Sequence, residues 1–149
     1  MEKFLVKNRK AWHDYHILER IEAGIVLKGS EVKAIREGKV SLTDAYCDFI
    51  ENELYLVEMN ISQYSHHGYA VHEPRRARKL LLHRQEIDRL QKKREGSGLT
   101  IIPLSIYWEK NNLKIEIALA QGKKQHDKRA AIAERESKRS LDQAMKRRR

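Results

Sequence analysis

Histidines are the first residues in this sequence whose type and spacing suggest chemistry. His66, His67 and His72 fall within seven residues, close enough to place imidazole nitrogens around a metal ion. No cysteine or paired carboxylate completes a four-ligand set. A solvated loop without metal is therefore the preferred interpretation, and these histidines receive no role.

The sequence also lacks the short patterns that hold a phosphate or activate a serine. GxxxxGK[ST], GxGxxG after a strand, and the GxSxG elbow are all absent. Asp44, Asp48, Glu51 and Glu53 surround one expected turn, but a nuclease would need a matching set of carboxylates for its metal ions. We therefore expect no catalytic residue, no cofactor and no enzyme activity.

Basic residues give the strongest chemical signal. The 149 residues include 31 Lys and Arg against 21 Asp and Glu, a formal net charge of +10, which favours a polyanionic partner. Residues 122–149 hold eleven of the basic and four of the acidic residues, a net +7, and residues 1–121 keep a net +3. We expect a folded RNA-binding domain over 1–121 and a basic C-terminal tail over 122–149.

Two smaller basic clusters lie within residues 1–121, one around Trp12 and His13 and one that ends in Arg78 and Lys79. A β-barrel with such surfaces can stack unpaired bases and track phosphates, so we expect Arg78 and Lys79 to contact RNA phosphates. A basic adaptor that docks to another RNA or to an anionic membrane is the alternative. No apolar run approaches the roughly 20 residues that span a bilayer, and we expect a cytoplasmic monomer without a membrane partner.

Alternating apolar residues predict about six short strands. They run over residues 13–27, 45–50, 54–57, 79–82, 102–108 and 113–119. Two or three short helices are expected, one after Ser30 as N-cap and ending at Gly38, another over 83–96. This pattern favours an antiparallel barrel or sandwich. The tail has too few large apolar residues to fold alone, so we expect it to be disordered when free and helical when bound.

Four segments resemble those of the small protein B family: EAGIVLKGSEVK over 22–33, ARKLLLH over 77–83, LSIYW over 104–108 and GKKQHDKR over 122–129. The match is collinear from about Asn8 to the end of the chain. The resemblance implies a closed, oligonucleotide-binding-like (OB-like) barrel. It also implies a partner, transfer-messenger RNA, whose tRNA-like domain the barrel binds during bacterial trans-translation. The tail is then expected to enter the empty mRNA channel of the small ribosomal subunit on stalled ribosomes.

The resemblance also implies site residues. In the barrel, the family's motifs match Asn8, His13, Glu22, Lys79 and Leu81. Glu22 could be a plain exposed carboxylate, but it could also accept hydrogen bonds from a base edge or a 2′-hydroxyl. Leu81 would by default be core, yet at least one of three consecutive leucines on a strand must face outward. In the tail, the residues expected to contact the ribosome are Gly122, Lys123, Lys124, Gln125, His126, Asp127, Lys128 and Arg129.

Overall fold

The computed structural model describes residues 3–63 and 72–123. Three α-helices lie within these residues: α1 (Arg9–Asp14), α2 (Gly29–Arg36) and α3 (Arg84–Arg94). The strands are β1 (Lys3–Lys7), β2 (Tyr15–Ile25), β3 (Val40–Ser41), β4 (Tyr46–Ile50), β5 (Glu53–Val57), β6 (Asn60–Ile61), β7 (Arg78–Leu81), β8 (Thr100–Glu109) and β9 (Asn112–Gly122).

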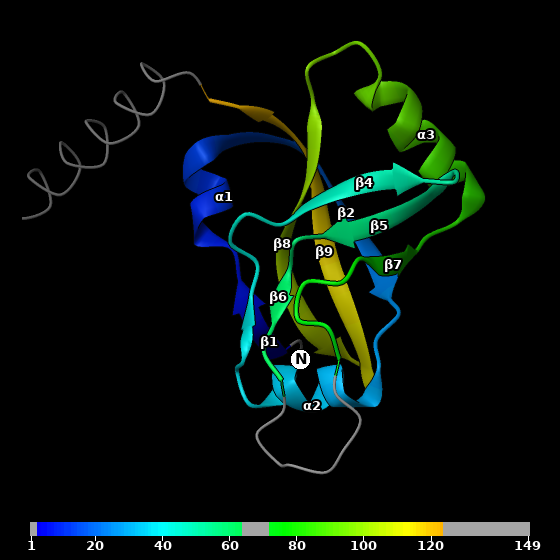
Figure 1. Cartoon of the computed structure of the whole chain (residues 1–149). Helices are drawn as coiled ribbons and strands as arrows, with labels where there is room; N and C mark the ends of the chain where they lie inside the picture. The colour runs from blue at the N-terminus through cyan, green and yellow to red at the C-terminus, as the bar shows by residue number, and fades with distance from the viewer. Residues whose placement is uncertain (1–2, 64–71, 124–149) are drawn as a thin grey trace, which may run out of the picture.

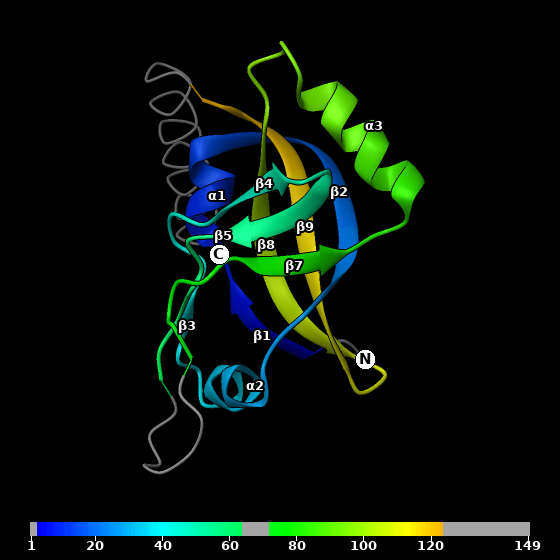
Figure 2. The same cartoon turned by 45° about the vertical axis from the view of Figure 1, so that its right-hand side comes forward.

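Six of the strands pair into a closed ring. The order is β8-β4-β5-β7-β2-β9, and a further pairing between β9 and β8 completes it, as Figures 1 and 2 show. Strand β1 pairs with the later part of β8, from Ser105 to Trp108, and β3 pairs separately with β6. All of these pairings are antiparallel. The mainly β, antiparallel prediction is confirmed, and the six-stranded ring is consistent with an OB-like fold.

The β8–β9 hairpin forms as the alternating pattern predicts. Ile106 and Ile115 face each other across the hairpin inside the ring. Lys110 and Asn111 make its turn with positive φ values of 46° and 66°, and Asn tolerates this left-handed region better than most residues. The register shifts between Pro103 and Ser105. Proline has no N–H to give to a strand ladder, which favours such an irregularity.

The N-terminal part of the chain differs from the prediction. The alternating pattern from His13 predicted a strand, but residues 9–14 form α1 and the strand begins only at Tyr15. The Asn8 side-chain oxygen accepts a hydrogen bond from the Ala11 N–H at 3.3 Å and caps the helix. Ala11 packs against Ile102 and Leu104 on the outer side of the ring. This tertiary contact and the cap outweigh the strand-like alternation.

Helices α2 and α3 lie at opposite ends of the ring (Figure 2). Helix α2 is capped at Lys28, whose backbone N–H donates to the Glu31 carboxylate at 2.8 Å, so Ser30 is inside the helix and is not its N-cap. Gly38 follows the helix with φ 77°, as expected. Helix α3, which lies within the predicted range 83–96, buries Ile87 and Leu90, three residues apart on one helical face.

Strand β9 sets where the tail can begin. It runs through Gly122, which pairs with Tyr15, and the Lys123 N–H donates to the Asp14 carbonyl at 2.8 Å. The first two residues of the predicted tail are therefore part of the folded unit. Residues 124–129 and the rest of the tail, including its predicted change from disorder to helix, lie outside the described residues.

Candidate nucleic-acid interface

A cleft opens on the outer side of the ring where β2 lies between β7 and β9. Gly24 on β2 pairs with Leu81 on β7 and with Lys114 on β9. Glu22, two residues earlier on the same strand, lines the cleft with them. We call this the Glu22 cleft, and its lining residues are Glu22, Ala23, Gly24, Leu81, Leu82, His83, Glu86 and Lys114.

The apolar part of the Glu22 cleft is a leucine that faces solvent. Leu81 is 53% exposed whereas Leu80 is fully buried, which confirms that one of the three leucines points outward. Its side chain lies over Gly24, where a Cβ atom would come within 3.2 Å of the Leu81 Cβ. Glycine at this position therefore lets the two strands approach and leaves room for the leucine.

The polar part of the cleft begins with Glu22. Its carboxylate accepts a hydrogen bond from the Tyr107 hydroxyl. Glu116 lies directly opposite on β9, and two like charges in such a pair repel each other. Arg20 relieves this repulsion, because its Nε and Nη2 donate to the Glu116 Oε1 at 3.0 and 2.9 Å. An ionised carboxylate accepts more than one hydrogen bond, so Glu22 keeps acceptor capacity for a ligand.

Two half-buried lysines add positive charge beside the cleft. Lys79 alternates with the buried Arg78 and Leu80 on β7, and so it points to the same side as Leu81. Lys114 is a lining residue that the sequence analysis missed. The alternation of β9 could have predicted that it faces outward. Its position beside Gly24 depends on the β2–β9 register, which joins residues 90 positions apart.

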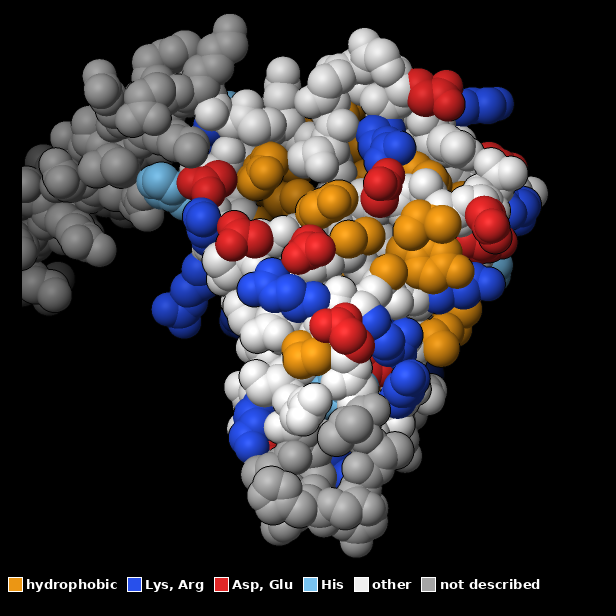
Figure 3. All heavy atoms as spheres, in the orientation of Figure 1, with side chains coloured by type: hydrophobic (Ala, Val, Ile, Leu, Met, Phe, Trp, Pro, Cys, Tyr) orange, Lys and Arg blue, Asp and Glu red, His pale blue; other side chains and the backbone are white. Residues whose placement is uncertain are grey.

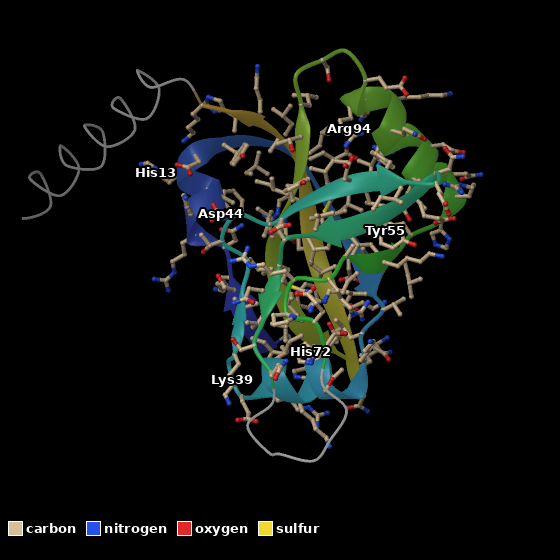
Figure 4. The ribbon with its side chains drawn as sticks, in the orientation of Figure 1. His13, Lys39, Asp44, Tyr55, His72 and Arg94 are labelled. Carbon is tan, nitrogen blue, oxygen red and sulfur yellow. The ribbon has the colours of Figure 1, made fainter. Side chains whose placement is uncertain are left out.

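The other predicted RNA-binding residues near the N-terminus lie apart from Lys79. His13 is on α1, on the opposite side of the ring from Tyr55, which pairs with Lys79 (Figure 4). Its Nδ1 is 2.8 Å from the Asp14 carboxylate. Asn8 is buried, and its amide nitrogen donates to the Pro103 carbonyl at 2.9 Å. The structure thus gives Asn8 a role in attaching α1, and its predicted RNA contact stays a prediction.

Arg78 lies inside the protein, so its predicted contact with RNA phosphates is corrected. Its side chain is 0% exposed. The Nε donates to the Glu31 Oε2 at 2.6 Å, and the Nη1 and Nη2 donate to the carbonyls of Met59 and Pro74 at 2.6 and 3.1 Å. A guanidinium with these partners has no open donor face on the surface. Only Lys79 remains as the predicted phosphate contact on β7.

The carboxylate that holds Arg78 is ionised. Burial of Glu31 favours its neutral form, but hydrogen bonds from Arg76, from the Lys28 N–H and from Arg78 outweigh that effect and hold the pKa of Glu31 below its usual range. His72 is buried in the same region, with its Nδ1 2.9 Å from the Ser30 hydroxyl and its Nε2 2.8 Å from the Ile61 carbonyl. These contacts join α2 to β6 and to the segment before β7.

The remaining chemical candidates contribute little to a site. Cys47 is buried, and burial raises the pKa of its thiol, so it packs as a small hydrophobe. His66 and His67 lie outside the described residues. Within residues 3–63 and 72–123, no cluster of His, Cys, Asp or Glu side chains could hold a metal ion, and no helix is long and apolar enough to cross a membrane.

The face that carries β4, β5 and β7 is mixed in charge. In Figure 3, acidic and basic side chains alternate across it, with hydrophobic side chains between them. Many of these charges pair with each other, for example Arg84 with Glu53 and Arg94 with Asp48. The folded unit therefore does not present a uniformly basic surface here, and affinity for RNA has to come from particular contacts.

An OB-like ring whose cleft holds an exposed leucine, an open carboxylate and a lysine, with a second lysine beside it, has the chemistry of the nucleic-acid-binding class of OB-like proteins. The sequence model of the family described as "SmpB protein" matches residues 5–147. The chain belongs to this family, which confirms the resemblance seen in its motifs.

Individual relatives agree with the family match. The chain is 51% identical over 147 residues to the SsrA-binding protein of Syntrophobacter fumaroxidans, with 99% of this chain and 91% of that protein covered. It is 50% identical over 146 residues to the SsrA-binding protein of Carboxydothermus hydrogenoformans, with 98% of each covered. A solved structure described as "tmRNA-SmpB: a journey to the center of the bacterial ribosome" superposes with a TM-score of 0.68 at 47% identity, over 85% of this chain and 93% of that one.

Proposed function

We propose that this chain binds the tRNA-like domain of transfer-messenger RNA and delivers it to stalled ribosomes for trans-translation. The observation that carries the proposal is identity of about half the residues over nearly the whole length of relatives named SsrA-binding proteins. The solved structure of similar fold belongs to a study of tmRNA-SmpB and the bacterial ribosome. The proposed role is binding and delivery, with no catalytic step.

The Glu22 cleft supplies suitable chemistry for RNA. Glu22 can accept hydrogen bonds from a base edge or a 2′-hydroxyl, the group that distinguishes RNA from DNA. Leu81 offers an apolar surface to a base that has left its stack, and Lys79 and Lys114 can neutralise phosphates on either side. The described face over β4, β5 and β7 is not uniformly basic, so these contacts favour a folded RNA with unpaired bases over a generic polyanion.

The tail is proposed to act on the ribosome. Residues 122–149 carry a net +7, and as a helix residues 127–149 would span about 35 Å. Such a basic helix suits a channel lined with RNA phosphates, such as the mRNA channel of the small subunit when no message fills it. Binding would then supply the contacts that order the tail.

The alternative is a basic adaptor for another RNA or for an anionic membrane. One experiment distinguishes transfer-messenger RNA from these two partners. The full chain is recovered from its own cells and the RNA that copurifies is sequenced. Transfer-messenger RNA should be strongly enriched, and a Glu22→Ala, Leu81→Ala double variant of equal abundance should lose most of that enrichment. Enrichment of another RNA, or stable binding to anionic vesicles without RNA, would contradict the proposal.

A further inference from the structure

Trp12 is a large aromatic side chain on the surface of the folded unit. It lies on α1 and is 48% exposed. The helix does not need it as an anchor, because Ala11 and the Asn8 cap already attach α1 to the ring. A single exposed hydrophobic residue needs no explanation by itself. The arrangement of its neighbours is what points to a role for Trp12.

Arg20 supports the indole ring. Its guanidinium carbon lies 5.4 Å from the centroid of the Trp12 ring, within the range of a cation–π interaction. The guanidinium is itself fixed by two hydrogen bonds to the Glu116 carboxylate, at 3.0 and 2.9 Å. An arginine held in this way restricts the ring next to it, so less entropy would be lost when a ligand packs on the ring.

Trp12 and Arg20 connect the predicted RNA-binding residues of α1 to those of the Glu22 cleft. Trp12 precedes His13 on α1, and Arg20 shares the outward face of β2 with Glu22. Residues two apart on a strand are about 7 Å apart, so Arg20 links Trp12 to the side of β2 that carries Glu22. A base packed on the exposed indole would be one that has left its stack, as bases of single-stranded RNA loops do.

We propose that Trp12, supported by Arg20, is a stacking platform for an unpaired base of the RNA that occupies the Glu22 cleft. The proposal rests on the proposed function and adds a residue that sets how the RNA lies across β2. Because the charge of Arg20 is already paired with Glu116, the platform adds contact area without neutralising a further phosphate. It should therefore change affinity and leave its salt dependence unchanged.

The chain offers a direct spectroscopic test, because it contains two tryptophans. A Trp108→Phe variant leaves Trp12 as the only indole, and Arg36, which stacks on Trp108 at 5.0 Å, can stack on the phenyl ring instead. The full-length variant is titrated with the tRNA-like domain of transfer-messenger RNA. Bound RNA should quench the emission of Trp12 and protect it from acrylamide. In a Trp12→Phe variant, the emission of Trp108, which lines a neighbouring pocket with Gly24 and Leu81, reports RNA at the Glu22 cleft independently of Trp12.

Affinity measurements with full-length variants separate stacking from mere proximity. Trp12→Ala and Trp12→Leu remove the aromatic ring on which the base would stack. Each should weaken RNA binding roughly 5- to 160-fold, the usual loss for one stacked base. Trp12→Phe keeps an aromatic face and should stay within about threefold of wild type. Leu18 is a matched control, since it is 55% exposed on β2, and Leu18→Ala should bind as wild type. The slope of log K against log salt should be the same in all variants.

The outcomes distinguish this proposal from the function on which it rests. If wild type binds the RNA and the Trp12 variants bind equally well, with no quenching of Trp12, the platform is refuted while the proposed function stands. If Trp12→Phe loses as much affinity as Trp12→Ala, or if both lose thermal stability in parallel with affinity, Trp12 is structural and the platform is again refuted. If wild type does not bind the RNA, both proposals fail together.

Discussion

Arg78 and Glu31 form an ion pair inside the protein, with the Arg78 Nε 2.6 Å from the Glu31 Oε2 and neither side chain exposed. Arg78 begins β7 and Glu31 lies in the first turn of α2. The same guanidinium holds the carbonyls of Met59 and Pro74. The pair therefore fixes the start of the strand that carries Lys79 and Leu81 to the surface.

Breaking this pair should destabilise the fold. Arg78→Ala removes one of the two arginines that pair with the buried Glu31 and leaves the carbonyls of Met59 and Pro74 without their donor. Breaking a buried ion pair in this way costs about 3–5 kcal/mol of the free energy of unfolding. Urea unfolding followed by circular dichroism measures the loss. Lys79→Ala, one residue along the strand and half-buried, should cost less than about 1 kcal/mol. Equal losses in the two variants would mean that the ion pair adds nothing to stability.

Acidification should weaken the fold through the same carboxylate. The pKa of Glu31 is lower in the folded protein than its ordinary value of 4.5. Its ionised form therefore stabilises the fold above that pH, and this contribution is lost as the pH falls from about 5 through the lowered pKa. The free energy of unfolding of a Glu31→Gln variant should depend less on pH between 6 and 3 than that of wild type. An identical dependence would show that Glu31 is not responsible.

Gly24→Ala should impair RNA binding more than stability. The added Cβ would meet the Leu81 Cβ at 3.2 Å, so Leu81 has to shift by a few tenths of an ångström on the surface that we propose for RNA. We expect a stability loss of about 1 kcal/mol or less and a clear loss of affinity for the tRNA-like domain. Gly29→Ala is a suitable control, because no atom lies within 4 Å of its added Cβ. Unchanged affinity in Gly24→Ala would place the RNA away from this cleft.

Substitutions in the Glu22 cleft should distinguish groups that bind bases from groups that bind phosphates. Glu22→Ala and Leu81→Ala should each weaken binding by roughly 1–3 kcal/mol, with a circular dichroism spectrum like that of wild type. Lys79→Ala and Lys114→Ala should also reduce the slope of log K against log salt, by about 0.7–0.9 for each phosphate that the variant no longer neutralises. A slope that stays the same in both lysine variants would contradict the proposed binding of phosphates by these lysines.

Local patterns were sufficient to predict the parts of the fold whose partners are close in sequence. The β4–β5 and β8–β9 hairpins and the buried face of α3 follow from alternation, turns and helical spacing. Helix α1 was missed because its anchor, Ala11 against Ile102 and Leu104, joins residues about 90 positions apart. Strand β1 was missed for the same reason, since its partner is the distant β8.

In the candidate site, too, local sequence patterns predicted some residue positions, and those that depend on distant residues were missed. The outward position of Leu81 follows from alternation along β7, which is a local property. The burial of Arg78 depends on Glu31, 47 residues away, and a run of basic residues gave no sign that one of them has a buried carboxylate as its partner. Lys114 was missed because its place in the cleft depends on which residues of β2 and β9 face each other.

The most direct test of the account compares RNA affinity with peptide tagging in a chain truncated after Lys123, which keeps the β9 pairing through Gly122 and the Lys123 contact with Asp14. The folded unit is proposed to hold the RNA and the tail to act on the ribosome. The truncated protein should therefore bind the tRNA-like domain within a few-fold of the full chain and should no longer support tagging on stalled ribosomes. If affinity and tagging fall together, the tail belongs to the primary RNA-binding surface and the proposed division of roles is wrong.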